Sequence, residues 1–245
     1  MTTNEMSRAF DIAYNNINSQ SAPGVNNFEK SVIFTKAQDD LIRSIYSPFN
    51  LLRKPFEGSE NRRTELKELI KAYSSTVPII NSNGLSTNSK FFEIPNDVYY
   101  IIQEEIETNS TACVDSPVMV IPMTHDEYNI QKKSPFRKPN NKKAWRMDIS
   151  KLDENPVVEI IFDYTITKYK MRYIKKPKPI IFSNFETDPE LIGMDLTVDG
   201  LNTITECELN SEYHNNIVDR AVEIATLNYR ENSLQTNVEL NNRNV

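Results

Sequence analysis

The stretch VVEIIFDYTITKYKMRYIKKPKPIIF, residues 157–182, decides the fold class of this chain. Val, Ile, Tyr and Phe dominate it, and Asp and Pro interrupt it, which is the composition of consecutive β-strands separated by turns. Polar and apolar side chains alternate from Lys168 to Tyr173, so a strand here places Lys168, Lys170 and Arg172 on one face. The stretch therefore predicts a β-sheet with a basic face.

The same composition extends through the middle of the chain and predicts six strands in all. One helix is expected to interrupt them at residues 124–132, because Thr124 and Glu127 have the spacing of a capping box. The predicted strands lie within residues 91–108, 111–124, 143–150, 157–166, 167–176 and 177–182.

Both ends of the chain carry helical periodicity instead. Apolar residues recur every three or four positions, and Ser59 is a candidate cap of the third helical segment. In the last segment Ile217 and Ile224 belong to one apolar stripe, which predicts a long helix packed on the core. The predicted helices cover residues 4–20, 28–45, 60–74 and 211–229.

The predicted fold class is therefore α+β, with N-terminal helices, a mainly antiparallel β region in the middle and a long C-terminal helix. We expect one integrated domain. Beyond Tyr229 the sequence has too few apolar residues to pack alone, which predicts a free or partner-bound tail anchored by Leu234, Val238 and Leu240. The predicted regions are residues 1–75 (helical), 76–205 (β-rich, with the basic loop), 206–229 (C-terminal helix) and 230–245 (tail).

Composition bounds the class of protein. With 245 residues the chain is long enough to bury a substantial core, and its two cysteines, Cys113 and Cys207, are far apart and predicted to be reduced core thiols. No apolar run approaches the ~20 residues of a membrane span, and the first residues lack the pattern of a signal peptide. We expect a protein that is neither membrane-integral nor exported by a standard signal.

No residue pattern predicts catalysis. His125 lies beside Asp126 and Glu127, but the other histidine, His214, is distant and expected on a helix surface, so these residues fit the first turn of a helix better than a metal site. Cys113 has no residues around it that would activate a nucleophile. The five glycines are isolated and form no phosphate-binding loop. We expect no enzyme activity, no metal and no cofactor.

Charge is strongly segregated along the chain. Residues 132–178 contain fourteen Lys and Arg against five Asp and Glu, a local net charge of about +9 that leaves about −15 for the remainder. Seven cations and no acid lie in residues 132–146, where Pro135 and Pro139 exclude a continuous helix. This loop is solvated, contacts an acidic protein surface or contacts nucleic acid, and the sequence leaves these readings open. The predicted contact residues are Lys132, Lys133, Arg137, Lys138, Lys142, Lys143 and Arg146 in the loop, and Lys168, Lys170, Arg172, Lys175, Lys176 and Lys178 in the second basic run.

Five segments, in order along the chain, resemble one protein family. They are APGVNNFEKSVIFTKAQDDLI (22–42), FEGSENRRTELKELI (56–70), IPMTHDEYNIQKKSPFRKPNNKKAWRMD (121–148), YKMRYIKKPKPII (169–181) and CELNSEYHNNIVDRAVEIA (207–225). Together they are similar to ring-forming structural proteins of the neck and tail barrel of crAss-like bacteriophages. The resemblance covers nearly the whole chain.

The resemblance implies a structural virion protein, assembled in the host bacterial cytoplasm. It implies a homo-oligomeric ring, a dodecamer, in the portal-to-tail connector or tail barrel of a short-tailed phage, as part of the DNA exit channel. The implied partners are the portal protein and other neck or tail ring proteins, with transient contact to phage DNA and none to membrane. A basic middle and acidic flanks suit a ring, since each subunit must present two different complementary faces. The alternative reading is an autonomous nucleic-acid-binding phage protein, against which the net charge of −6 argues.

Overall fold

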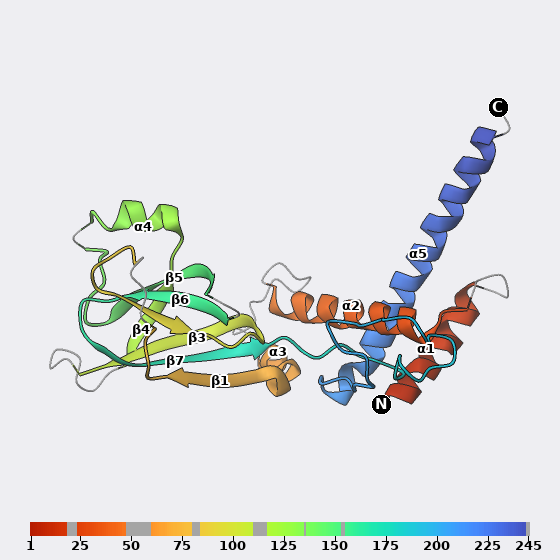
Figure 1. Ribbon diagram of the computed structural model, residues 1–245, viewed down its shortest axis with the longest axis horizontal. Helices are drawn as coiled ribbons and strands as arrows, with labels where there is room; N and C mark the ends of the chain where they lie inside the picture. Colours follow the sequence, from red (N-terminus) through yellow and green to blue (C-terminus); the bar gives the residue numbers. More distant parts are fainter. Residues whose placement is uncertain are drawn as a thin grey trace. The chain divides into compact units, whose positions relative to one another are not determined.

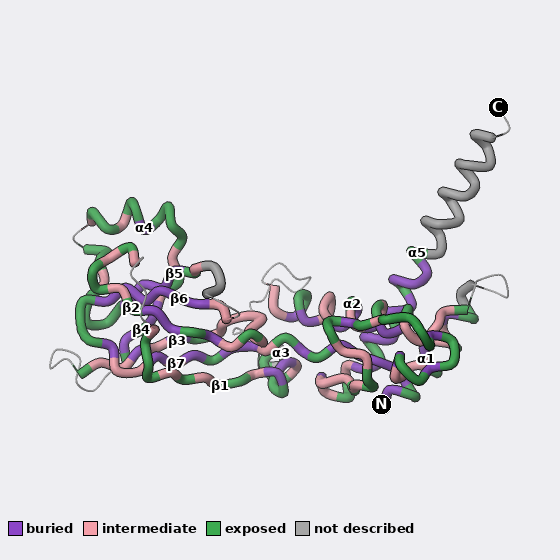
Figure 2. Tube along the Cα trace, viewed as in Figure 1, coloured by how far each residue is buried: buried purple, intermediate pink, exposed green. Residues whose placement is uncertain are grey.

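The computed structural model describes residues 1–18, 24–47, 60–79, 84–109, 117–134, 136–152 and 155–243 (Figure 1). They form two compact units. The sheet unit is the continuous stretch Ile70–Lys176, and the helical unit combines Met1–Leu69 with Pro177–Val245. Buried residues gather inside each unit (Figure 2). The predicted α+β class is confirmed.

The sheet unit is built on one seven-stranded sheet with the order β1-β7-β3-β4-β5-β6-β2. Neighbouring strands are antiparallel except β4 and β5, which run parallel, so the prediction of a mainly antiparallel region is confirmed. The strands are β1 (Ile70–Ser75), β2 (Ser89–Glu93), β3 (Val98–Thr108), β4 (Val118–Pro122), β5 (Lys143–Leu152), β6 (Asn155–Ile161) and β7 (Ile166–Lys175).

Strand β7 shows the alternation of buried and more exposed side chains that its sequence predicts. Tyr169 and Met171 are buried, whereas Lys168 and Lys170 are half-buried. The ring of Tyr169 stacks on Phe92 of β2 with centroids 5.3 Å apart, although β2 and β7 are not neighbours in the sheet. The sheet curls (Figure 1), and one face encloses a core to which β2 through β7 all contribute. Burial of this apolar face is what fixes the strand register.

A short helix, α4 (His125–Gln131), lies between the two parallel strands β4 and β5. Parallel neighbours cannot be joined by a tight turn, so the chain must cross over, and α4 with the loop after it makes that crossover. The predicted capping box is confirmed: the Thr124 hydroxyl accepts a hydrogen bond from Glu127 N, and the Glu127 carboxylate accepts one from Thr124 N. Tyr128 fastens α4 to the sheet by an edge contact with the ring of Trp145, at 5.9 Å between centroids.

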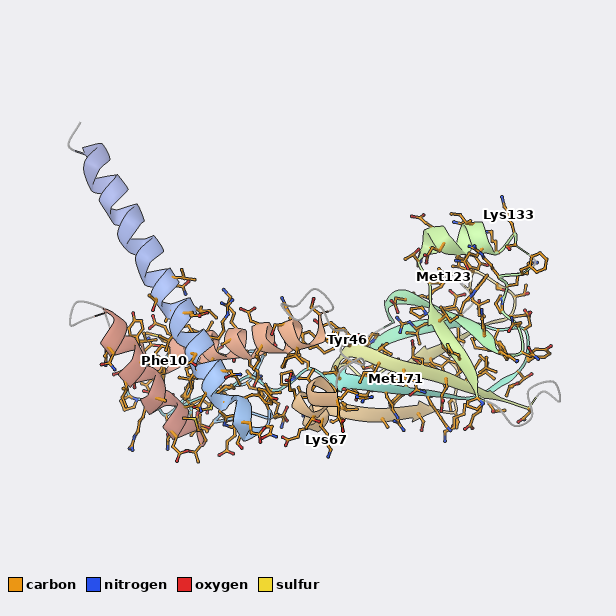
Figure 3. The ribbon with its side chains drawn as sticks, turned by 180° about the vertical axis from the view of Figure 1, so that it is seen from behind. Phe10, Tyr46, Lys67, Met123, Lys133 and Met171 are labelled. Carbon is orange, nitrogen blue, oxygen red and sulfur yellow. The ribbon has the colours of Figure 1, made fainter. Side chains whose placement is uncertain are left out.

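The helical unit packs α1 and α2 against α5. Phe10 of α1, labelled in Figure 3, is fully buried and lies 5.5 Å from the ring of Phe34 on α2. Ile217 and Ile224 of α5 are buried, which confirms the predicted stripe, although Leu227 on the same helix is exposed. The helices are α1 (Thr3–Asn18), α2 (Asn27–Tyr46), α3 (Glu60–Glu65), η3 (Lys67–Leu69), η5 (Ser211–Tyr213) and α5 (His214–Arg243).

The segment 177–182, predicted as a strand, belongs to the helical unit and pairs with no strand of the sheet. It runs along α2, whose polar side chains bind its backbone at 3.0–3.2 Å. Phe182 N donates to Ser31 Oγ, Ile180 N donates to Thr35 Oγ1, and Gln38 Nε2 donates to Lys178 O. These helix positions are spaced by four and three, so they share one face. The apolar composition of the segment reflects burial against a helix.

Two further boundaries differ from prediction. A helix was predicted over residues 60–74, but Ile70–Ser75 forms strand β1 instead. This strand pairs with β7 along its whole length. At the other end α5 continues to Arg243, past the predicted limit at Tyr229, through a segment that contains neither Gly nor Pro. Cys113, Ser59 and Pro135 lie outside the described residues.

The predicted regional boundaries also shift. The β-rich region was expected over residues 76–205, but the strands of the sheet begin at Ile70 and end at Lys175. Residues 177–205 belong to the helical unit instead, because they fold against α2. Sequence composition cannot distinguish an extended segment that covers a helix from one that joins a sheet.

Candidate functional site: two basic surfaces

The loop between α4 and β5 carries most of the predicted contact residues. We call residues 132–143 the basic tip. All six of its cations are exposed, and Lys133 marks the turn that follows α4 in Figure 3. The tip ends in a closed turn, where Asn140 and Lys143 exchange two backbone hydrogen bonds of 3.0 and 3.1 Å and the Asn140 side chain accepts one from Lys142 N. These cations are Lys132, Lys133, Arg137, Lys138, Lys142 and Lys143.

The cations of the basic tip are not neutralised by the parts of the chain that the structure describes. Lys132 lies 5.1 Å from the centroid of the Tyr128 ring, a cation–π contact. No ion pair joins any of the six to a described acidic residue. The tip also holds Phe136, whose side chain is 92% exposed, and Ile130 on the adjoining α4 is 72% exposed. Sequence analysis missed both, although an aromatic residue between Pro135 and Arg137 is a visible signal.

Arg146 was predicted to belong with the loop, but it lies within β5 and is buried. Its Nη1 is 2.7 Å from Glu104 Oε2 of β3, and its Nε is 3.2 Å from Asp148 Oδ1. The hydroxyl of Tyr169 donates to the other oxygen of Glu104. Burial opposes the charge on Arg146, but the two carboxylates outweigh it and raise the pKa of the guanidinium. Arg146 is therefore an internal cross-link of the sheet.

The second basic surface is the face of β7 that points away from the core. Lys168, Lys170 and Arg172 border a hollow of about 410 Å³ on this face. Acids of β3 lie opposite them: Glu105 pairs in register with Lys170, and Glu107 forms an ion pair with Lys170 that lowers the pKa of the carboxylate. The face is thus of mixed charge, and less basic than the sequence of β7 alone suggests.

The remaining predicted contacts are divided between the units. Lys175 and Lys176 end the sheet unit, where Lys176 N donates to Asp97 O at 2.7 Å. Lys178 begins the segment on α2 and has an exposed side chain. The predicted anchors Leu234, Val238 and Leu240 fall in the part of α5 whose side chains lie outside the description.

His214, expected on a helix surface, is buried at the start of α5. Its Nδ1 lies 3.0 Å from the N-terminal amine of Met1, and its Nε2 lies 3.0 Å from Leu209 O. Both ring nitrogens thus serve the packing of the helical unit. Within the described ranges no group of three His, Cys, Asp or Glu could hold a metal ion. The helices described there include none apolar and long enough to cross a membrane.

Comparison with known proteins identifies the family of this chain, which the geometry of the two surfaces does not reveal. Residues 1–237 match the family model described as phage tail ring protein 3/4. Ring protein 4/5 of Bacteroides phage crAss001 is 36% identical over 250 residues, covering 99% of both chains. Ring protein 3 of the same phage is 34% identical over 231 residues, covering 93% of this chain and 96% of the relative. The similarity therefore extends through both units.

Proposed function

Since this chain belongs to the phage tail ring protein 3/4 family of crAss-like phages, we propose that its copies form a closed ring in the portal-to-tail connector or tail barrel. The ring surrounds the channel through which DNA leaves the virion, in dodecameric register with the portal, and its axial neighbours are the portal or other ring proteins. The observation that carries this proposal is the family match over residues 1–237, with relatives aligned over nearly their full length.

Charge distribution supports the ring. The sheet unit contains fifteen Lys and Arg against thirteen Asp and Glu, whereas the helical unit contains thirteen against twenty-one. A closed ring needs head-to-tail contacts in which one face of a subunit meets a different face of the next. A chain whose two units carry opposite net charge can supply two such faces, and opposite charges also guide subunits into one register.

Cryo-electron microscopy of the virion tail and neck tests the proposal directly. We expect density for this chain in a closed cyclic ring on the tail axis. Finding the chain in the virion as an isolated monomer, or as a dimer with identical contacting patches, would refute the ring. A closed ring found far from the portal would revise the proposed position of the protein in the tail, but it would still support assembly as a ring.

The unpaired cations of the basic tip favour a second candidate function, autonomous binding of nucleic acid. A protein that binds DNA through several phosphate contacts loses affinity steeply as salt rises. The net charge of −6 opposes such binding at long range, so we expect little affinity of the isolated chain for duplex DNA at physiological salt. A salt titration by fluorescence anisotropy decides this, since tight and steeply salt-dependent binding would favour the second candidate.

A further inference from the structure

The helical unit contains a surface whose chemistry is the opposite of the basic tip. Residues 179–219 include nine Asp and Glu and no Lys or Arg. Within them, residues 184–202 fold into a compact segment that we call the acidic lobe. Phe185 N donates to Asn202 O at 3.0 Å and closes the lobe, while Phe185, Leu191 and Val198 are buried in its core.

The acidic lobe has a defined backbone. Val198 and Leu201 exchange two backbone hydrogen bonds of 2.8 and 3.0 Å across a tight turn. The two residues of that turn, Asp199 and Gly200, have φ of 49° and 79°, values that such turns require and that Gly adopts without strain. The lobe is therefore ordered before any partner arrives, which lowers the entropic cost of binding.

The exposed side of the acidic lobe combines carboxylates with apolar side chains. Glu186, Glu190 and Asp195 are exposed and form no ion pair with a described Lys or Arg. Between Glu190 and Asp195 lie Ile192 and Met194, which are 63% and 58% exposed. The basic tip has the matching combination, unpaired cations around Phe136 and beside Ile130. Protein interfaces commonly place apolar and aromatic anchors at the centre and charged groups at the rim.

We propose that the basic tip of one copy docks on the acidic lobe of the next copy, with Phe136 seated against Ile192 and Met194. This inference rests on the proposed ring and assigns its subunit contact. The partner is a second copy because every copy carries both surfaces, on different units, so the same contact repeats head to tail. Neither surface complements itself, since the cations of two tips repel each other, as do the carboxylates of two lobes.

Isotope-resolved cross-linking tests the contact. Full-length unlabelled and ¹⁵N-labelled chains are mixed at high concentration and low salt, then joined by a zero-length carbodiimide reagent, which links only amines and carboxylates in direct contact. We expect mixed-isotope links from Lys138, Lys142 or Lys143 to Glu190 or Asp195. Links between these residues that are always of one isotope would mean an intrachain contact, and links of the tip to other surfaces alone would mean another interface. Either result overturns the inference.

Charge exchange gives a second test. In one variant Arg137, Lys138, Lys142 and Lys143 become Glu; in the other Glu186, Glu190 and Asp195 become Lys. We expect each variant alone to self-associate at least about tenfold more weakly than the wild type in sedimentation experiments, and the equimolar mixture to recover, because each altered surface meets its complement on the other chain. A mixture no stronger than its components would overturn the contact. The control variant reverses Lys67 and Lys90, which are exposed elsewhere, and should associate as the wild type does.

The apolar anchor is tested separately from charge. Phe136→Ala should weaken association about tenfold, as truncation of a central aromatic residue does in other interfaces. Val77→Ala is the matched control, since Val77 is 73% exposed in the same unit and lies outside the proposed contact. Equal effects of the two substitutions would remove Phe136 from the interface. A closed ring in virions whose tips and lobes are far apart would overturn this contact while leaving the proposed function standing.

Discussion

The two units of this protein are stabilised in different ways. The sheet unit is one continuous stretch whose strands satisfy one another's backbone groups, and its one buried ion pair joins β3 to β5 within the described residues. The helical unit joins the two ends of the chain, and its irregular segment, residues 177–182, is bound by side chains of α2. Regular hydrogen bonding between strands is visible in sequence periodicity, whereas a backbone bound by the side chains of a distant helix is not.

The substitution with the largest expected effect on stability should unfold the helical unit and leave the sheet unit folded. Ile217 of α5 is fully buried, so Ile217→Asp places an unpaired charge in the core and should cost about 4 kcal/mol or more. Hydrogen exchange should show loss of protection in α1, α2 and α5, with β7 still protected. Leu227→Asp on the exposed side of the same helix is the control and should change stability little. Equal loss of protection in both units would show that they unfold as one.

A slightly smaller effect is expected in the sheet unit. Arg146→Met leaves Glu104 buried without its cationic partner and should cost about 3 kcal/mol in urea unfolding. The double variant Glu104→Leu, Arg146→Met removes both charges and should recover part of that loss, but not all of it, because the buried Tyr169 hydroxyl loses the carboxylate to which it donates. Lys170→Met, which breaks a pair of partly exposed side chains, is the control and should cost much less. If the double variant were no more stable than the single one, the pair would not be the source of the loss.

Removing one of the α2 side chains that bind the backbone of residues 177–182 should lower the free energy of unfolding by about 1–2 kcal/mol. Ser31→Ala removes the acceptor for Phe182 N, a buried donor that no water can reach to replace it. Ser44→Ala is the matched control, because the Ser44 hydroxyl only donates to Leu41 O on the exposed side of the same helix. Chemical denaturation of both variants measures the difference. Equal small losses would mean that the segment is held by its apolar side chains alone.

A pH effect distinguishes the units further. Burial raises the pKa of the Cys207 thiol in the helical unit to about 11. The folded thiol therefore keeps its proton where the unfolded thiol, with an ordinary pKa near 9, has lost it. This contribution to stability is complete below about pH 9 and disappears as pH rises to about 11. At pH 8, in a Cys113→Ser background, alkylation of folded Cys207 should be about a hundredfold slower than in urea, and a comparable rate would contradict the shift.

The smallest effect on stability should accompany a large effect on assembly. Reversing Arg137, Lys138, Lys142 and Lys143 to Glu alters exposed side chains that have no described ion-pair partner, so the free energy of unfolding should change by less than about 0.5 kcal/mol. Incorporation into virions should nevertheless fail. Normal incorporation and infectivity would show that the basic tip is only solvated.

Local chemistry explains which features were predictable. The capping box at Thr124 and the alternation of β7 depend on residues a few positions apart, and the structure contains both. Strand β1 was missed because Leu66, Leu69 and Tyr73 also fit a helical stripe, and only pairing with β7 decides between the two conformations. The burial of Arg146 was missed for a similar reason, since its partner Glu104 is remote in sequence.

The crossover that carries the basic tip meets the hydrogen-bonded network of the sheet at its last residues, where Met119 N donates to Lys142 O at 3.2 Å. Strands β4 and β5 then pair with each other directly, Met119–Pro122 against Lys143–Arg146. Loops of this kind accept insertions and replacements at little cost in folding free energy. The length and charge of the tip can therefore change at little cost to the folding of the sheet unit.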